Sequence, residues 1–575
     1  MKRRTGRRGV LAAVAGLAAI GMLLSGCGAG GGSNEATGAE EPASGFPNDY
    51  QGAYPMPSTD KAYNNPKSRD EVKDGGTLTL PTTYTPNWNV FSVDGNTAYM
   101  QSMAQFYMPS LYSLDLKGNI TWNKDYIEKA ELVSKDPQVV KFDINPKAKW
   151  NNGKDIDWTA FEATWKVSNG SNPDYNPPST DGWDKIKSVT EGDNAKQAVV
   201  TFSQPWYPWE ALFSSLYNPD ATDPKVFTQG WNDNPHNEWA AGPFKVEKAD
   251  QNQAVFVPNE KWWGDKPKLE KVTFKYMEDV ASLNAFKNGE VDAVTFASNT
   301  SLQTVKDTKD IEIRLGYGTS TNVLVYNGKA GALKDQKVRQ AITMGLDTKT
   351  WEKIHFQGLN WTPKAAGSEL FPLFQKGYED NRPEDVRAVN VDGAKKVLES
   401  DGYKLGDDGY YQKDGKTLSL RYTYFGDAAT GTALAKGYQQ MMKAIGVKIE
   451  LDNRDNSKFS DTVTQGSYEI LPMGWSSPSP YSQVNVSQLY GSDSPSNYTY
   501  VGSAEVDKLA AVPGTIPEQL KAVAAANKAE KAALKLYGTT PVDVPPSFYA
   551  VKKGLANYGP AGFTSTDVIN LGWQK

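Results

Sequence analysis

The chain has 575 residues, of which 39% are hydrophobic, 11% aromatic and 22% charged, a length that predicts about three to four domain-sized units. The 16 Trp, 29 Tyr and 20 Phe exclude a largely disordered chain, and a mean hydropathy of −0.58 excludes a multi-span membrane protein. A net charge of −5 with no basic stripe argues against nucleic acid as a partner, and one Cys with two His argues against a metal site or cofactor of the thiol-rich or His-rich kind.

The N-terminal residues are typical of a bacterial signal peptide. Five basic residues within the first eight precede an apolar run at 10–24, which is too short to span a bilayer comfortably. The run ends in Leu24-Ser25-Gly26-Cys27, which resembles a lipobox. We therefore expect residues 1–26 to be removed and Cys27 to carry lipid. A plain signal peptide, or a short anchor helix with an incidental Cys, is the alternative. Arg7-Arg8 leaves twin-Arg export open beside the general route.

A Gly-, Ser- and Ala-rich stretch follows, and we expect residues 27–74 to form a flexible lipid-anchored tether. Removal of residues 1–26 leaves 57 basic and 67 acidic residues, so the mature net charge is −10. An acidic body does not adhere to anionic lipid, so the lipid anchor is the expected membrane contact. The predicted location is the outer face of the cytoplasmic membrane.

Alternating hydrophobic residues then predict a series of strands, at 77–80, 139–144, 197–202, 255–258 and 271–276. Asp279 is placed to cap a helix that ends at Gly289, and residues 291–296 predict the next strand. Strand, helix and strand in this order predict a βαβ unit.

The clearest unit comes later in the chain. A strand at 418–424, a helix at 430–445 and a strand at 447–451 have the length of a βαβ unit, so we expect the two strands to be parallel. Asp414-Gly415 predicts a hairpin turn just before it, and residues 517–537 predict a long helix. The fold class that this pattern predicts is α/β with mixed sheets.

Catalytic motifs are mostly missing from the sequence. Gly415-Lys416-Thr417 is similar to the end of a phosphate loop, but Tyr410 stands where the first Gly is required. No G-x-S-x-G or H-E-x-x-H occurs, and His236 and His355 lie in unrelated contexts. We therefore expect no enzyme, although paired carboxylates of a glycosidase have no local signature that would reveal them.

Large aromatic residues are frequent in the predicted loops. Such residues usually belong to a core, but several together can line a ligand cleft and pack against apolar side chains or sugar faces. The tryptophans in or near predicted turns are Trp88, Trp206, Trp209, Trp351, Trp361 and Trp475.

From Gly75 to its end, the chain resembles the family 5 extracellular solute-binding proteins, the oligopeptide and dipeptide receptors of ABC importers. Each matching block is weak alone, but their common order over most of the chain is specific. The blocks are 141–157 with Asn152-Gly153-Lys154, Gly242-Pro243-Phe244, 259–267 with Trp262-Trp263, Gly289-Glu290-Val291-Asp292, Val338-Arg339-Gln340-Ala341-Ile342 with Asp347, 394–403 and Gly446-Val447-Lys448-Ile449.

The resemblance implies a periplasmic-binding-protein-like clamp of type II, with two lobes and an extra N-terminal subdomain. Lobe I would take residues 75–100, 235–320 and 541–575, the subdomain 101–234, and lobe II 321–540. The lobes would close on a ligand. The implied function is that of a monomeric receptor that captures oligopeptides and delivers them to a membrane permease with its ATPase subunits.

Two loops of the family's cleft can be located. One follows the first strand and contains Tyr84, Trp88 and Asn89; the other contains Gly474, Trp475, Ser476 and Pro478. We expect Trp475 and Trp88 to stack on or pack against the ligand, and Gly474, Ser476 and Asn89 to form hydrogen bonds, with Tyr84 and Tyr107 as further candidates.

Pro478 departs from the family pattern. Peptide binders of the family have G-W-x-x-D here, where the Asp takes the peptide ammonium, and a buried ammonium without a carboxylate is costly. Either another Asp supplies the charge, or the ligand is not a free-amine peptide. An oligosaccharide receptor of the same fold is therefore the main alternative. A carbohydrate-active enzyme and a lipoprotein sensor without transport are the others.

Overall fold

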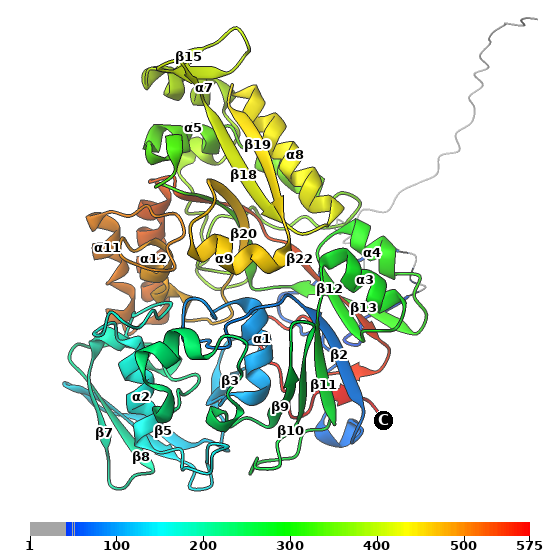
Figure 1. Cartoon of the computed structure of the whole chain (residues 1–575), viewed down its shortest axis with the longest axis vertical. Helices are drawn as coiled ribbons and strands as arrows, with labels where there is room; N and C mark the ends of the chain where they lie inside the picture. Colours follow the sequence, from blue (N-terminus) through cyan, green and yellow to red (C-terminus); the bar gives the residue numbers. More distant parts are fainter. Residues whose placement is uncertain (1–41, 49, 51) are drawn as a thin grey trace, which may run out of the picture. The chain divides into compact units, whose positions relative to one another are not determined.

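The structure of the chain is a computed structural model, and it describes residues 42–48, 50 and 52–575. The expected signal peptide, Cys27 and the first part of the expected tether lie outside these residues. Among the helices of the described residues, none combines the length and the apolar character that crossing a bilayer requires. Figure 1 shows the arrangement of the elements, for which we keep the names lobe I, subdomain and lobe II.

Lobe I contains two four-stranded sheets, one mixed and one antiparallel. In the first, β2 (Thr77–Thr82) pairs in parallel with β11 (Lys271–Tyr276), and β10 (Gln253–Pro258) and β9 (Phe244–Ala249) continue it antiparallel. The second is antiparallel and has the order β1 (Phe46–Pro47), β13 (Ile311–Tyr317), β22 (Pro546–Lys552) and β12 (Ala293–Phe296). Helices α1 (Ala98–Tyr107), α3 (Asp279–Lys287) and α4 (Asn299–Val305), and the short pair β23 (Leu555–Ala556) and β24 (Gly572–Trp573), complete the described elements near these sheets.

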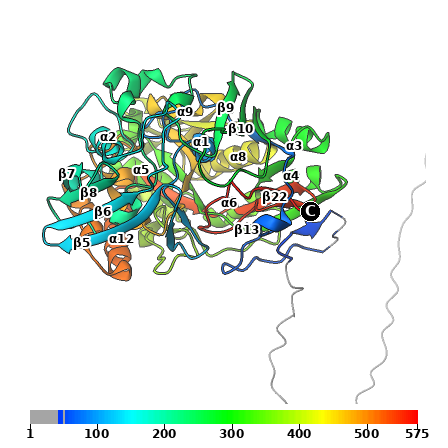
Figure 2. The ribbon, with the colours of Figure 1, turned by 90° about the horizontal axis from the view of Figure 1, so that it is seen from below.

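The subdomain is built on one antiparallel sheet. Its order is β5 (Ile127–Lys135), β6 (Gln138–Ile144), β8 (Gln197–Phe202) and β7 (Ile186–Glu191), and helix α2 (Trp158–Ser168) packs on β7 and β8. Residues of β6 alternate between buried and half-buried positions, which places Val140, Phe142 and Ile144 in the core. A separate hairpin, β3 (Tyr112–Leu114) with β4 (Ile120–Trp122), leads into the sheet. In Figures 1 and 2, strands β5, β7 and β8 of the subdomain lie at the left of the molecule, and helices α3 and α4 of lobe I lie at the right.

Lobe II has a five-stranded mixed sheet. The order is β19 (Lys448–Arg454), β18 (Ser419–Phe425), β20 (Ile470–Ser476), β14 (Ser320–Tyr326) and β21 (Thr539–Asp543). Strands β18 and β19 are parallel and are joined by α8 (Ala429–Ala444), which confirms the βαβ unit predicted there. Tyr438 and Met442 of α8 are fully buried against this sheet, as one face of an amphipathic helix should be.

The remaining elements of lobe II pack around this sheet. Val338, Ala341 and Ile342 form the buried face of α5 (Gln336–Met344), as apolar residues three and four positions apart do on a helix. A small sheet contains the predicted hairpin, in which Asp414 and Gly415 both have positive φ, the requirement of a two-residue type I′ turn. The other helices are α6 (Thr348–His355), α7 (Val391–Ser400), α9 (Phe459–Thr464), α10 (Val486–Tyr490), α11 (Ala504–Ala510) and α12 (Gln519–Leu534), and the small sheet is β15 (Lys404–Leu405), β16 (Tyr411–Lys413) and β17 (Lys416–Thr417).

The described residues of the expected tether do not form a flexible linker. Phe46 pairs with Ile313 in a sheet, Tyr63 is buried and its amide donates to the Pro560 carbonyl at 2.8 Å, and Val72 is fully buried. Apolar side chains in an otherwise polar stretch explain the difference, because burying them against lobe I stabilises an ordered path for the chain.

The first βαβ unit was predicted wrongly, because its two strands do not lie in one sheet. Strand β11, helix α3 and strand β12 all form, but β12 pairs antiparallel with β22 in the other sheet, and β2 takes the parallel position beside β11. The helix also begins one residue earlier than predicted, since Glu278 rather than Asp279 is the residue before its first turn.

Contacts join lobe II to the other two parts on both sides of the molecule. The Tyr207 amide of the subdomain donates to the Gly514 carbonyl at 2.9 Å. At the side of lobe I, the Val280 amide donates to Asp427 Oδ1 at 3.0 Å, and the Asn456 amide donates to Glu278 Oε1 at 3.0 Å. Lobe II therefore lies against both lobe I and the subdomain.

Candidate ligand-binding site

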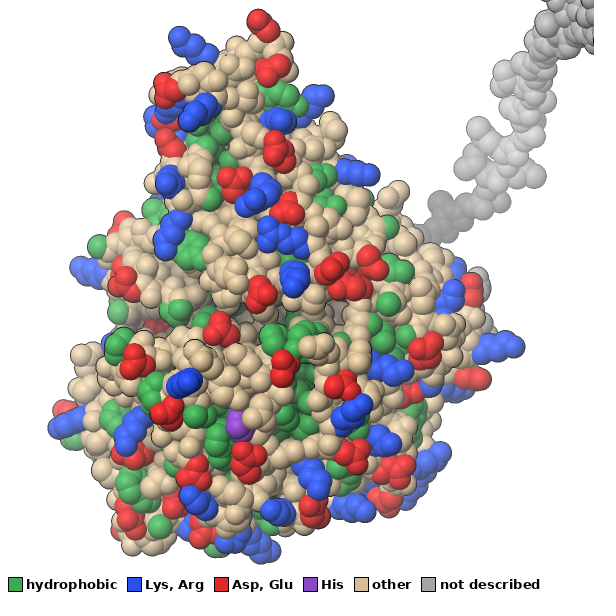
Figure 3. Space-filling model, viewed as in Figure 1, with side chains coloured by type: hydrophobic (Ala, Val, Ile, Leu, Met, Phe, Trp, Pro, Cys, Tyr) green, Lys and Arg blue, Asp and Glu red, His purple; other side chains and the backbone are tan. Residues whose placement is uncertain are grey.

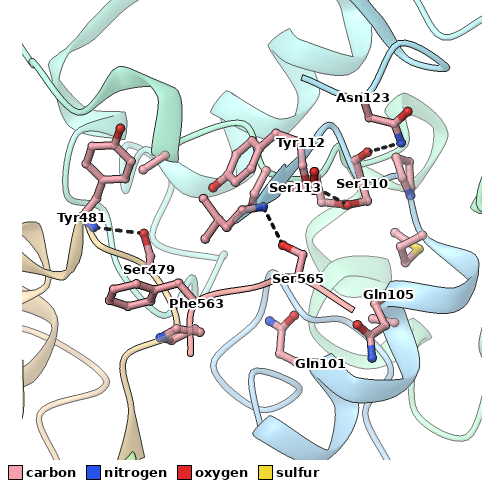
Figure 4. Close-up of a pocket in the computed structure, with 18 of the residues that line it drawn as sticks. Gln101, Gln105, Ser110, Tyr112, Ser113, Asn123, Ser479, Tyr481, Phe563 and Ser565 are labelled. Carbon is pink, nitrogen blue, oxygen red and sulfur yellow. Dashed lines mark hydrogen bonds between the residues drawn. The ribbon is translucent and has the colours of Figure 1, made fainter. Parts of the chain in front are cut away.

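A cavity lies where the three parts meet. Its volume of about 960 Å³ is at the upper end of the usual range for a ligand pocket. Segments from distant parts of the chain form its walls. Four of them are helix α1, the β3–β4 hairpin, the loop after β20 and a segment close to the C-terminus, and the subdomain adds residues from 179–183 and 206–215. Figure 4 shows side chains from all four, and they include Gln101, Gln105, Tyr112, Ser113, Ser479, Tyr481, Phe563 and Ser565.

Hydrogen bonds hold these walls in place. The Leu114 amide donates to Ser565 Oγ at 2.9 Å, so the C-terminal segment is fixed to the β3–β4 hairpin. Asn123 Nδ2 donates to the Ser110 carbonyl at 3.0 Å, and the Tyr481 amide donates to Ser479 Oγ at 3.1 Å. The walls are therefore set by the protein itself, as a preformed pocket requires.

The lining is rich in hydroxyl and amide groups. Tyr112 and Tyr481 face each other across Figure 4, and burial together with Tyr481 raises the pKa of Tyr112 to about 12. At neutral pH the Tyr112 hydroxyl thus keeps its proton and can donate a hydrogen bond. Aromatic faces accompany these groups, including Trp122, Tyr126, Trp183, Trp206 and Trp262.

The charged groups of the cavity have one sign. Asp181 and Asp567 are the carboxylates in the lining, and none of the described lining residues is Lys, Arg or His. Burial raises the pKa of Asp181 to about 6. Across the described ranges, no group of three or more His, Cys, Asp or Glu side chains is arranged to hold a metal ion. On the face shown in Figure 3, by contrast, acidic and basic side chains are interspersed.

A second cavity, of about 370 Å³, lies between α3, β12 and α4 of lobe I and α8, β14 and β20 of lobe II. Three of its lining residues donate hydrogen bonds to the fully buried Asp543 behind them: Trp351 Nε1 at 2.6 Å, Asn322 Nδ2 at 2.8 Å and His355 Nδ1 at 2.8 Å. His355 is thus a packed, hydrogen-bonded residue rather than an isolated base.

The predicted residues of lobe II lie at the end of β20, between the two cavities. Gly474 lines the smaller cavity, while Pro478 and Ser479 line the larger one. Ser476 is exposed, and its hydroxyl forms a hydrogen bond with Thr319 Oγ1 at 2.9 Å. Trp475 packs partly against the core around α12, and its indole Nε1 is buried without a hydrogen-bond partner among the described residues.

The predicted residues of lobe I lie elsewhere. Trp88 and Tyr107 belong to one core cluster with the first sheet of lobe I, although the predicted bounds placed Tyr107 in the subdomain. Only 3% and 0% of their surface is exposed, and their ring centroids lie 5.8 Å apart. Asn89 is buried and its Nδ2 donates to the Phe227 carbonyl at 2.8 Å. Tyr84 donates to Asp233 and lines, with Trp88, a separate hollow of about 200 Å³. The structure therefore does not bring these four residues together with Trp475, because packing within lobe I uses them.

Sequence reasoning missed the residues that the subdomain and the C-terminal segment contribute to the larger cavity. Asp181 follows Ser179-Thr180 in a loop with no motif, and Phe563 and Ser565 lie in a segment with no regular structure. The Ser- and Pro-rich stretch from Ser476 to Tyr481 could have indicated part of the cavity, because it continues the cleft loop that the family resemblance places at Gly474 and Trp475.

Comparisons with known proteins identify the family and the relatives of this chain. The family model for bacterial extracellular solute-binding proteins, family 5, matches residues 122–497. The chain belongs to this family. It is 32% identical over 515 residues to the oligopeptide-binding protein OppA of Mycobacterium tuberculosis, covering 88% of this chain and 86% of that one. Its identity to OppA of Lactococcus lactis subsp. lactis is 25% over 433 residues, covering 65% and 69%.

Solved structures show the same fold for this solute-binding protein. AppA of Bacillus subtilis in complex with a nonapeptide superposes with a TM-score of 0.77 at 20% identity, covering 88% of this chain and all of that one. A periplasmic EDTA-binding protein, EppA, gives 0.76 at 24% identity, covering 89% and 98%. NikZ of Campylobacter jejuni in complex with Ni(L-His) gives 0.72 at 20% identity, covering 88% and 100%. The α/β clamp fold is therefore confirmed, and the fold accommodates ligands of different chemistry.

Proposed function

We propose that this solute-binding protein captures oligopeptides between lobe II and the rest of the molecule and delivers them to a membrane permease with its ATPase subunits. The observation that carries the proposal is the cavity of about 960 Å³ bordered by the loop after β20. The relatives named above that bind oligopeptides support the choice of ligand. We propose that the chain itself catalyses no reaction.

The lining suits a peptide because a buried peptide backbone needs hydrogen-bond partners of both kinds. Gln101, Gln105 and Asn485 offer amide donors and acceptors, and Ser and Tyr hydroxyls offer both. Gly474 and Ser476 lie at the exposed end of β20, and we propose that their backbone groups contribute in the manner of an added strand. Trp475 then supports this strand end from within the core, instead of stacking on the ligand.

A direct binding screen tests this function. The protein that begins at residue 27 is incubated with a casein hydrolysate or with a set of oligosaccharides, washed by gel filtration, and its retained ligands are identified by mass spectrometry. We expect retained peptides and a higher melting temperature, because a ligand that binds only the folded form stabilises it. Retention of sugars alone would contradict the peptide assignment.

An oligosaccharide is the second candidate, and one observation favours it. Hydroxyl and amide groups beside several aromatic faces, with no basic side chain among the described lining residues, are also the composition of a sugar site. The same screen separates the two ligands, because both are offered to one protein preparation.

We also propose that Cys27 is the lipid attachment site, which holds the receptor at the outer face of the cytoplasmic membrane as a monomer. The Leu24-Ser25-Gly26-Cys27 sequence supports this. Replacing Cys27 with Ala should move the protein from the detergent phase to the aqueous phase in Triton X-114 partitioning. Ser33→Ala is the matched control and should stay in the detergent phase, whereas retention of Cys27→Ala there would contradict the proposal.

A further inference from the structure

The family's ammonium-binding carboxylate is replaced by Pro478, so a captured peptide needs another partner for its N-terminal charge. Two carboxylates, Asp181 and Asp567, line the large cavity. An ammonium group removed from water needs a carboxylate and hydrogen bonds to compensate the loss of hydration. These two aspartates are therefore the candidates for the partner of the peptide ammonium.

Asp567 is already occupied by its own turn. Its Oδ1 accepts from the amides of Ile569 and Asn570, each at 3.2 Å, and its Oδ2 accepts from Asn570 Nδ2 at 2.7 Å. The side chain is also exposed to solvent. Such a carboxylate is well stabilised without a ligand and gains little from an additional cation.

Asp181 is in a different situation. Ser179 Oγ donates to Asp181 Oδ2 at 2.9 Å, and the Ser487 hydroxyl of α10 provides a second hydrogen bond. No Lys, Arg or His in the described part of the chain forms an ion pair with Asp181, because the nearby Lys185 pairs with Asp184 at 2.6 Å. The carboxylate therefore has polar partners that orient it and no cation that neutralises it.

The position of this loop places the carboxylate between two parts of the molecule. Ser496 Oγ of lobe II donates to the Pro178 carbonyl at 2.8 Å, and Ser487 of lobe II reaches Asp181 itself. Asp181 thus lies where the subdomain meets lobe II, and both line the same cavity as Pro478. A cation held there is enclosed from two sides.

We propose that Asp181 binds the N-terminal ammonium of the captured peptide, in place of the carboxylate that the family carries at the position of Pro478. This inference rests on the proposed peptide-binding function. It names a subdomain residue as the group that recognises the free N-terminus, opposite to the lobe that usually supplies it.

Protonation of Asp181 should control this interaction. Burial, opposed by the hydrogen bonds from Ser487 and Ser179, raises the pKa of Asp181 to about 6. Among charged groups, Asp184 contributes to the increase and Lys185 opposes it. Below this pH the carboxyl group is neutral and loses its attraction for an ammonium. Affinity for a free-amine peptide should therefore increase from pH 5 to pH 7.5.

The test uses one peptide that the protein retains from the casein hydrolysate, synthesised with a free and with an acetylated N-terminus. Isothermal titration calorimetry at pH 7.5 should show at least about tenfold weaker binding of the acetylated form to the wild type. Asp181→Asn should weaken the free-amine peptide by a similar factor and leave the acetylated peptide unchanged. Its pH dependence between 5 and 7.5 should disappear.

Asp184→Asn is the matched control, since it removes one negative charge from the same loop outside the cavity lining. It should preserve the preference for the free-amine peptide. Equal binding of both peptide forms by the wild type, or loss of the preference in Asp567→Asn and not in Asp181→Asn, would overturn the role of Asp181 while peptide binding stands. If the wild type retains no peptide at all, the proposed function and this inference fall together.

Discussion

Two glutamates lie side by side in the interior of lobe II, and they divide one proton and one charge between them. The fully buried Glu530 accepts hydrogen bonds from Ser368 Oγ at 2.6 Å, the Glu369 amide at 2.8 Å, Asn381 Nδ2 at 2.6 Å and the Tyr490 hydroxyl at 2.9 Å. Glu369 accepts one from Thr539 Oγ1 at 2.6 Å. Burial, together with the neighbouring Glu530, raises the pKa of Glu369 to about 8. Glu530 is therefore the carboxylate and Glu369 holds the proton.

This pair predicts how stability depends on pH. The pKa of Glu369 is raised on folding, so its contribution to stability is complete below its ordinary value of 4.5 and is lost as the pH rises towards about 8. Glu369→Gln keeps a neutral, hydrogen-bonding side chain at every pH. Urea unfolding at pH 9 should show this variant to be more stable than the wild type, by on the order of 2 kcal/mol, and the difference should disappear near pH 5.

Glu530→Gln is the matched comparison. Its amide would point a donor at groups that are themselves donors, so we expect a loss of about 2–4 kcal/mol at both pH values. A Glu369→Gln variant that is less stable than the wild type at pH 9 would contradict the assignment of the proton.

For single residues, the sequence predicted a chemical difference from the family better than it predicted which side chains lie in the cavity and which lie in the core. The departure at Pro478 was visible from the family pattern, and the structure shows that this residue lines the large cavity. Trp88 and Tyr107 could not be told apart from ligand-binding aromatics, because core and cleft both favour large rings and only packing separates them. No sequence pattern marked Asp181 as a ligand-binding residue. Its proposed role depends on its neighbours Ser487 and Pro478, which lie about 300 residues away in the chain.

Among the elements, α8 shows how one helix face holds lobe II together. Met442 is fully buried against the sheet and Gln440, two residues earlier, is exposed. Met442→Ala should lower the free energy of unfolding by about 2–5 kcal/mol, because it removes buried methylene groups and leaves a cavity. The measurement is urea unfolding of the ligand-free protein.

Gln440→Ala tests whether the face, rather than the helix itself, carries the effect. This change should stay within about 0.5 kcal/mol of the wild type, since the side chain contributes little to packing. Equal losses in the two variants would contradict the described burial of α8.

Elements were predicted well where their partners are near in sequence. The β18–α8–β19 unit and the hairpin at Asp414-Gly415 are formed by neighbouring segments, so periodicity and turn chemistry were sufficient. Strand β12 was predicted as a strand but given the wrong partner, because its true neighbour β22 begins at Pro546. A local pattern shows that a strand exists and which side is apolar, but it does not show which distant strand lies beside it.

For the whole molecule, the contact of lobe I with lobe II brings like charges together. Glu278 and Asp279 of lobe I meet Asp427 and Asp455 of lobe II. Burial, and then the other carboxylates, raise the pKa of Glu278 and Asp279. Because these groups bind protons more tightly when the lobes touch, lowering the pH should favour the contact.

Asp427→Asn tests this effect without a ligand. The Asn oxygen can still accept from the Val280 amide, and the substitution removes one repelling charge. Small-angle X-ray scattering at pH 7.5 should give a smaller radius of gyration than the wild type, and the difference should vanish at pH 5. Asp407→Asn, an exposed site in the small sheet region, should behave as the wild type does. A larger radius for Asp427→Asn at pH 7.5 would refute the repulsion.

The interleaving of strands in lobe I also sets an order of assembly for a chain that becomes available from its N-terminus onward. Strand β22 lies between β13 and β12, yet it follows β13 by roughly 230 residues, which take roughly ten to fifty seconds to synthesise. The core of lobe II needs only β14 to β21, so it can be complete while β12 and β13 still have open edges. Lobe I therefore starts to form first and is completed last. Until β22 is available, its unpaired strand edges are prone to pair with another chain, and a chaperone that covers them would prevent this.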